Sequence, residues 1–219
     1  MRTWSPETAR DLRKASFQRR NRQGRGMRIA GLVLVVIAAV LGAYVWYLLY
    51  GTGLTTKRWQ GELRPAFEKT IATKAPEQAP PPLETVKVPG GAVAIIDIPR
   101  IDLDMVVVEG TDTESLKKGP GHYADTAYPW QKHGRVAIAG HRTTYQHPFF
   151  NLDELELGDP IILETEYGIF RYEVTRVFIT TPYDLSVLDQ TRQPTLVLTT
   201  CNPKFSASQR LVVFAARVG

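Results

Sequence analysis

The chain contains a single cysteine, and its surroundings make it the first candidate for chemistry. Cys201 ends an apolar run, TLVLTTC, which precedes a loop of mostly small and polar residues (Asn202 to Gln209) and a second apolar run starting near Arg210. If the two runs pair as antiparallel strands, Cys201 and Arg210 face each other with Cα atoms about 4.5–5.5 Å apart. Because arginine keeps its charge, it can stabilise a thiolate, bind a carboxylate or carbonyl, or meet developing oxyanion charge. The alternative is a buried apolar cysteine beside an edge-strand charge.

A histidine that could serve this thiol follows another apolar run. The segment GRVAIAGHRTTYQHPFF delivers His141 just beyond the predicted strand Arg135 to Ala139. Thiol acyl transfer needs a group that protonates the leaving amine, and histidine is the usual one. A strand-end histidine with a purely structural hydrogen bond is the competing interpretation. Of the remaining histidines, His133 and His147 lie in loop-like sequence, and His122 lies in a GPGHY turn that could line a pocket.

Metal and disulfide chemistry are disfavoured by the same residues. The four histidines are scattered, with few carboxylates nearby, so we predict no metal site. One cysteine excludes an internal disulfide framework and any multi-cysteine zinc or iron–sulfur site.

The elements that must position these residues are short β-type runs with turn signals between them. Seven or eight strands in the last 127 or so residues predict a barrel or a sandwich. In the longest run the apolar phase flips after Val174, which predicts a bulge or a barrel corner. Short helices are expected at Thr113 to Lys118, capped by Asp112, and at Asn151 to Leu155, capped by Asn151. The predicted strands are Val93 to Ile98, Met105 to Val108, Arg135 to Ala139, Pro160 to Glu164, Ile169 to Thr180, Thr195 to Thr200 and Leu211 to Arg217.

Composition argues for one ordinary domain with appendages and against nucleic-acid binding. The chain has 219 residues, 43% hydrophobic and 22% charged, which is close to the globular average. The net charge of +5 is confined to the tail: residues 1–28 hold nine basic and two acidic side chains, a net +7, so the remainder carries −2. A slightly acidic body offers no electrostatic footprint for DNA or RNA.

Residues 29–50 predict an uncleaved transmembrane signal anchor. These 22 residues contain no charge, Asn, Gln or Pro, and as a helix they would span roughly 33 Å, enough to cross a bilayer core of about 30 Å. The far end is an aromatic belt that includes Tyr44, Trp46 and Tyr50, where a signal peptide would have a small-residue cleavage site. The basic tail, residues 1–28, predicts a cytoplasmic N-terminus and an extracytoplasmic remainder. Residues 51–92, with a helical stretch around Arg58 to Ala72 and then a Pro-rich run, are expected to be a linker that holds the domain at 93–219 away from the membrane.

These residues together resemble the sortases, extracytoplasmic cysteine transpeptidases of Gram-positive bacteria. The resemblance lies in VAIAGHRTTYQHPFF and LVLTTCNPKFSASQRLVVFAAR and spans roughly residues 92–219. The family signature is TLxTC followed by a downstream arginine, and Val197 stands here where the family has its first Thr. The HRTTY continuation is most similar to class E sortases, the housekeeping type of high-GC actinobacteria.

The resemblance implies a mainly β fold, a closed sortase-like barrel with short helices behind one transmembrane helix, and it implies roles. Cys201 would be the nucleophile, His141 the acid and base, and Arg210 the binder of substrate and oxyanion. Thr200, Tyr145 and His122 are the expected substrate contacts, and no cofactor is expected. The enzyme would cleave an LPxTG- or LAxTG-like sorting signal between Thr and Gly through a thioacyl intermediate. It would then join the surface protein to an amine of lipid II or another acceptor, such as a pilin lysine.

Two other functions remain open from the residues. One is a cysteine peptidase or L,D-transpeptidase acting on peptidoglycan, although Thr199 and Thr200 precede the cysteine where the latter family has a Gly-containing turn. The other is a non-enzymatic surface β-domain scaffold with a buried Cys201.

Overall fold

The computed structural model describes residues 27–47, 51–73 and 90–219, and the chain divides into two compact units, Met1–Tyr47 and Leu48–Gly219. In the first unit, the helix Met27–Trp46 is apolar from Ile29 onward, and none of its most apolar stretch is buried. Among the described residues it is the one helix long and apolar enough to cross a membrane. Its exposure is unlike that of a buried core helix. Most of the predicted basic tail, and the predicted end of the anchor at Tyr50, lie outside the described residues.

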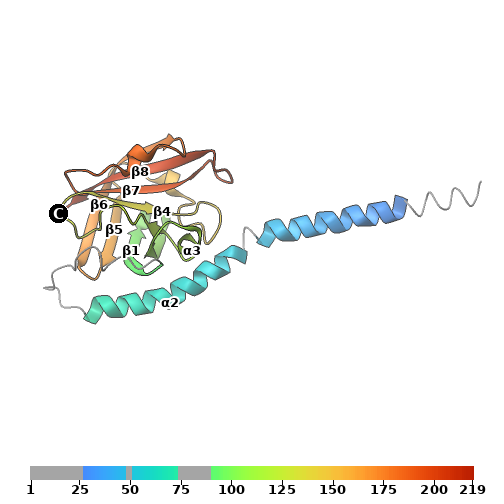
Figure 1. Ribbon diagram of the computed structural model, residues 1–219, viewed down its shortest axis with the longest axis horizontal. Helices are drawn as coiled ribbons and strands as arrows, with labels where there is room; N and C mark the ends of the chain where they lie inside the picture. Colours follow the sequence, from blue (N-terminus) through green and yellow to red (C-terminus); the bar gives the residue numbers. More distant parts are fainter. Residues whose placement is uncertain (1–26, 48–50, 74–89) are drawn as a thin grey trace, which may run out of the picture. The chain divides into compact units, whose positions relative to one another are not determined.

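The second unit is built on a closed eight-stranded barrel, which confirms the predicted fold class (Figure 1). Around the barrel the strands follow the order β1-β2-β3-β4-β7-β8-β6-β5. Most neighbours are antiparallel, but β4 and β7 are parallel, as are β2 and β3. The strands are β1 (Ala92–Ile98), β2 (Leu103–Glu109), β3 (Gly121–His122), β4 (Arg135–Ala139), β5 (Pro160–Thr165), β6 (Gly168–Thr180), β7 (Thr195–Asn202) and β8 (Gln209–Val218).

The strand pattern of the sequence matches these elements within two residues at each end. The exception is β3, whose two residues lie in the GPGHY segment expected to be a turn. A two-residue strand carries too little alternation to be recognised from sequence.

The barrel interior is filled by the inward-facing half of each strand. In β1, Ile96 and Ile98 point into the main core while Ile95 packs on the outer surface, as period-two alternation requires. In β6 the register with β8 shifts between Val174 and Arg176, which confirms the bulge predicted from the phase flip. The bulge lets Val174 and Val177 both contact the same core.

Helix α2 (Thr52–Thr73) packs against the barrel and belongs to the same compact unit (Figure 1). Its Phe67 is buried against Ile95 and Val106. Gln60 supplies hydrogen bonds that a strand would otherwise make: its amide donates to the carbonyl of Val106 (3.0 Å) and accepts from the Val106 N–H (2.8 Å). Because β3 is only two residues long, it cannot pair with β2 at Val106, and Gln60 covers that edge.

The docking of α2 on the barrel alters the interpretation of residues 51–92 as a linker. The helix expected around residues 58–72 is present and longer, but it is docked on the domain, so the first half of the 51–92 segment does not act as a free spacer. The Pro-rich half lies largely outside the described residues.

Short helices connect the strands. The predicted α3 (Thr113–Leu116) is capped as expected, because the Asp112 carboxylate accepts from the N–H groups of Glu114 and Ser115. The second predicted helix is a single 3-10 turn, η4 (Leu152–Glu154), in which the Asn151 side chain makes no capping hydrogen bond. Two further 3-10 turns are η3 (Pro99–Ile101) and η5 (Leu185–Leu188).

Candidate active site

Cys201 and Arg210 are direct cross-strand partners in the antiparallel pair β7–β8. Both side chains are half-buried. Opposed residues in such a pair project to the same face of the sheet, so the thiol and the guanidinium share one face at the loop end of the two strands. The Arg210 guanidinium donates to the carbonyls of Ala207 (3.2 Å) and Gln209 (3.0 Å), which keeps it beside the β7–β8 loop.

His141 reaches the same end of the barrel from the other side of β7. Strand β4 runs parallel to β7, with Ala139 opposite Thr199. The contact continues one residue further, because the Gly140 N–H donates to the Thr199 carbonyl (3.1 Å) and the Thr200 hydroxyl donates to the Gly140 carbonyl (2.8 Å). His141 is two residues beyond Ala139, as Cys201 is two beyond Thr199. The three residues therefore lie on adjacent segments, with the cysteine in the middle.

The glycine before His141 is required by packing. A Cβ at Gly140 would lie 2.5–2.9 Å from ring atoms of Phe149, which is fully buried. The backbone that carries His141 thus passes directly over an aromatic ring. This close approach fixes the position of the His141 backbone relative to the buried Phe149 ring.

The His141 ring is half-buried, and its Nε2 atom has no hydrogen-bond partner among the described residues. Tyr145 lies against the ring, with centroids 4.9 Å apart. Burial lowers the pKa of His141, because the imidazolium loses hydration that no neighbouring acceptor replaces. The imidazole is therefore neutral at pH 7 and free to accept a proton, and the imidazolium it becomes is a stronger acid than usual.

This burial gives a pH dependence of stability with a definite sign. In the unfolded chain the imidazole takes up a proton as pH falls through about 6.5, whereas folded His141 takes it up only at lower pH. Between those values the unfolded state binds more protons, so the free energy of unfolding falls as pH falls. We expect the variant His141→Gln to lose this part of the slope. Urea unfolding of both proteins between pH 4.5 and 7.5 checks it; parallel curves would contradict it.

Tyr145 belongs to a strained turn that α2 holds in place. Tyr145, Gln146 and His147 all have positive φ angles, 51°, 59° and 40°, a conformation that non-glycine residues rarely adopt. The Tyr145 N–H donates to the hydroxyl of Thr52 at the start of α2 (3.1 Å). The docked helix thus supports the residue that packs on His141.

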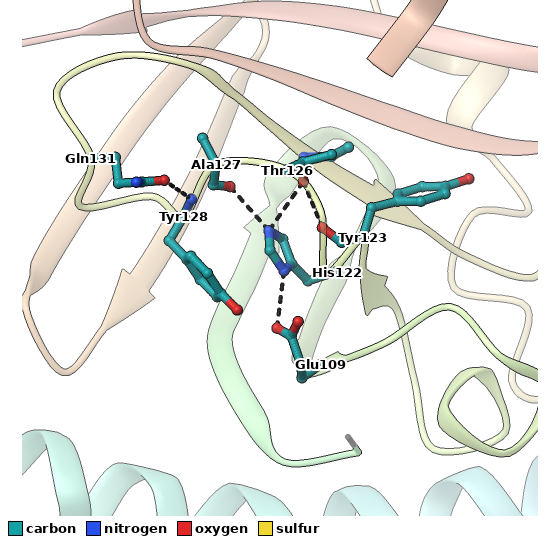
Figure 2. A network of polar contacts seen from close by, with 8 residues as sticks. Glu109, His122, Tyr123, Thr126, Ala127, Tyr128 and Gln131 are labelled. Atoms are coloured by element: carbon teal, nitrogen blue, oxygen red, sulfur yellow. Dashed lines mark hydrogen bonds and ion pairs between the residues drawn. The ribbon is translucent and has the colours of Figure 1, made fainter. Parts of the chain in front are cut away.

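Two of the expected substrate contacts lie inside the protein. Thr200 is buried, and its hydroxyl joins β7 to Gly140, as described above. His122 is 1% exposed, with Nδ1 3.0 Å from the Glu109 carboxylate and Nε2 3.0 Å from the carbonyl of Ala127 (Figure 2). Neither side chain is exposed. Both make hydrogen bonds inside the protein, where substrate contacts were expected. Tyr145 is the one of the three beside His141.

The His122 cluster was not anticipated from the sequence. Figure 2 shows the Tyr128 ring beside His122, with its hydroxyl directed toward Glu109, and the two rings are 4.5 Å apart. Burial and the negative charge of Glu109 raise the pKa of Tyr128 well above its ordinary value. Because Glu109 ends β2 and His122 belongs to β3, the cluster holds the shortest strand of the barrel in place.

No group of three or more His, Cys, Asp or Glu residues in the described parts of the chain could hold a metal ion. Around Cys201 the structure places the imidazole of His141 on one neighbouring segment and the guanidinium of Arg210 on the other, groups that can take part in thiol acyl transfer.

A barrel with this trio at one end defines a class of cysteine-dependent acyl-transfer enzymes, and comparisons with known proteins identify the family. A family model for the Sortase domain matches residues 96–218. Sortase D of Bacillus subtilis (strain 168) is 33% identical over 200 residues, covering 87% of this chain and 98% of that protein. The chain belongs to the sortase family of cysteine transpeptidases.

Solved structures agree with this assignment. The Clostridium perfringens Sortase D5 transpeptidase is 30% identical, with a TM-score of 0.60, covering 75% of this chain and 99% of that one. Sortase E1 from Streptomyces coelicolor, solved with a tripeptide in the active site, is 35% identical, with a TM-score of 0.57, covering 61% and 91%. The similarity thus extends to sortases of both classes D and E.

Proposed function

We propose that this protein is a membrane-anchored sortase that cleaves an LPxTG- or LAxTG-like sorting signal between Thr and Gly. It then joins the carbonyl group of that Thr to an amine. The observation that carries the proposal is the meeting of Cys201, His141 and Arg210 on adjacent segments at one end of the barrel. Cys201 acts as the nucleophile, His141 as acid and base, and Arg210 as the binder of the carbonyl oxygen.

In the first half-reaction the Cys201 sulfur attacks the carbonyl carbon of the substrate threonine. The thiol proton passes to His141, whose neutral imidazole accepts it, and the developing oxyanion faces the Arg210 guanidinium. The Thr–Gly C–N bond breaks as His141 protonates the leaving glycine amine. A thioester on Cys201 and a free glycine-bearing peptide result.

In the second half-reaction an incoming amine attacks the thioester carbonyl. His141 removes a proton from that amine, and the thiolate leaves and is reprotonated. The product is a new amide bond, and water is a competing nucleophile. The acceptor amine belongs to lipid II or a pilin lysine, and the substrates are surface proteins that carry the sorting signal.

Location and class belong to the same proposal. The exposed apolar helix Met27–Trp46 anchors the protein, and the basic residues that precede it keep the N-terminus in the cytoplasm. The catalytic domain then faces the cell-wall precursors outside a Gram-positive cell. The HRTTY segment and the 35% identity to a sortase E structure support a class E housekeeping role with LAxTG preference.

The test is mass spectrometry of products formed by the full chain in detergent micelles. The probes are an LAxTG peptide, an LPxTG peptide and a triglycine acceptor. We expect a thioester adduct on Cys201 and a ligated product in excess of the hydrolysed one. Hydrolysis alone would assign a peptidase, a thioester formed only with muropeptides would assign an L,D-transpeptidase, and an unreactive thiol would assign a scaffold; each would overturn the proposal.

A further inference from the structure

Each of the three site residues has a polar neighbour in the sequence, and those neighbours also contact one another. Arg142 follows His141, Asn202 follows Cys201, and Gln209 precedes Arg210. The Arg142 Nη1 donates to the Asn202 side-chain oxygen (2.7 Å), and the Asn202 amide donates to the Gln209 side-chain oxygen (2.9 Å). Adjacent strand residues point to opposite faces. In the β7–β8 pair, Asn202 and Gln209 therefore lie on the face opposite to Cys201 and Arg210.

Arg142 also holds the backbone of the nucleophile. Its Nη1 donates to the carbonyl oxygen of Cys201 (3.2 Å), and its Nη2 is 2.9 Å from the Asp153 carboxylate at η4. The Arg142 side chain is 3% exposed, although that of Asp153 is 44% exposed, so a guanidinium displaced from these partners would remain as an unpaired buried charge. One rigid group thereby links the segment carrying His141, the residue carrying the thiol, and the turn beneath them.

The geometry of these contacts suits arginine and no other residue. The guanidinium is planar, and its two terminal nitrogens diverge, so one can serve Cys201 and Asn202 while the other serves Asp153. Lysine could make one or two of the three contacts as a point charge. Arg210 differs in exposure and in the face it occupies: it is half-buried on the thiol's face and donates to carbonyls of the β7–β8 loop, where a substrate can reach it.

We propose that Arg142 is a positioning residue that sets the separation and orientation of the Cys201 thiol relative to the His141 imidazole, through the Cys201 carbonyl and Asn202. This inference rests on the function proposed above. Arg142 does not meet the substrate; it acts by placing Cys201 and His141, the residues that react with it. A small displacement of the reacting groups is costly in catalysis, on the order of 10²-fold in rate for about 1 Å.

The first test is steady-state kinetics of peptide-to-amine transfer by full-length variants in detergent. We expect Arg142→Met to lower kcat about 10²-fold while KM stays within about threefold, and Arg142→Lys to recover roughly tenfold of that loss. Asn202→Ala, which keeps the ion pair between Arg142 and Asp153, is expected to lower kcat about fivefold. If Arg142→Met does not fold, Asn202→Ala and Arg142→Lys decide the outcome.

A control arginine lies at the start of β4, the strand whose other end leads to His141 and Arg142. Arg135, the first residue of β4, donates to the carbonyl of Val187 (2.8 Å) and to the Thr195 hydroxyl (3.3 Å). Arg135→Met removes a second arginine that bonds to protein oxygens, half-buried where Arg142 is buried, at the end of β4 far from His141. We expect it to lower the melting temperature and to leave kcat at the wild-type value. An equal kcat loss in Arg135→Met would reduce Arg142 to a general stabilising role.

A second test needs no substrate and so separates this inference from the proposed function. The rate of Cys201 alkylation by iodoacetamide is measured across pH for wild type, His141→Gln, Arg142→Met and the double variant. In the wild-type background we expect His141→Gln to slow alkylation at least about fivefold near neutral pH. In the Arg142→Met background it should change the rate less than about twofold, because thiol and imidazole are no longer aligned.

The two failures are thus distinguishable. Absence of peptide transfer by wild type, with the alkylation coupling intact, would remove the sortase substrate but retain Arg142 as the positioning residue. Folded Arg142→Met and Asn202→Ala proteins with wild-type kcat and the same dependence of alkylation on His141 would overturn the inference.

Discussion

Replacing Cys201 with alanine is expected to abolish thioester formation and transfer, with a loss of at least about 10⁴-fold in kcat. Cys201 is the only cysteine in the chain, so no second thiol can take its place. The side chain is half-buried at the end of β7 and fills no part of the main core. The melting temperature should therefore stay within about 2 °C of wild type, as expected for a small change at a partly exposed position.

The measurement combines mass spectrometry of the intact protein with product analysis. Cys201→Ser is the matched control for size, since a hydroxyl occupies nearly the same volume but is a far weaker nucleophile without a dedicated base of suitable strength. Both variants should still bind the sorting-signal peptide with near wild-type affinity, because Tyr145 and Arg210 are intact. Retention of ligated product in either variant would show that another residue forms the acyl intermediate.

The strands could be predicted from the sequence because their information is local, whereas their closure into a barrel was implied by the resemblance to sortases. Strands such as Ile169 to Thr180 show period-two alternation, and the flip after Val174 marks the bulge that the register with β8 contains. The opposition of Cys201 and Arg210 followed from counting residues on either side of one loop. Each of these inferences concerns neighbours in one strand or one hairpin, where the pleat fixes the side-chain direction.

The contacts that were missed join segments far apart in the chain. Helix α2 was expected to begin a spacer because a Pro-rich run follows it in the sequence. Its docking involves Gln60 and Thr56, which bond to backbone groups 46–61 residues away. The sequence patterns assigned no role to Arg142. Its burial depends on Asp153 and Asn202, which no periodicity connects. A charged residue next to a candidate catalytic histidine was the available signal.

For His122 the sequence predicted a substrate contact, whereas the structure places the side chain in the interior. A histidine in a Gly- and Pro-rich segment suggested a pocket residue, because such segments usually lie on the surface. Here the segment contains the two-residue strand β3, which is enclosed between β2 and β4. The buried carboxylate of Glu109, 13 residues earlier, pairs with the ring, and buried polar side chains generally require such a partner. The pairing turns a presumed binding residue into a structural one.

Substituting His141 with glutamine is expected to lower kcat/KM about 10²–10⁴-fold, the range over which a positioned acid and base contributes. Glutamine approximates the imidazole in size and keeps hydrogen-bonding groups, but it transfers no proton near neutral pH. The loss should be largest with peptide substrates, whose amine leaving group must be protonated. A thioester or activated-ester substrate, whose leaving group departs unprotonated, should lose about tenfold less in the acylation step.

The pH profile makes this expectation specific to His141. Because burial lowers the pKa of this imidazole, the acidic limb of wild-type kcat/KM should lie below pH 6.5, where the base becomes protonated, and His141→Gln should lack that limb. His133→Gln is the control: this histidine is exposed and its Nδ1 faces the Arg192 carbonyl (2.8 Å), so kcat should be that of wild type. An acidic limb that persists in His141→Gln would assign the proton transfer to another group.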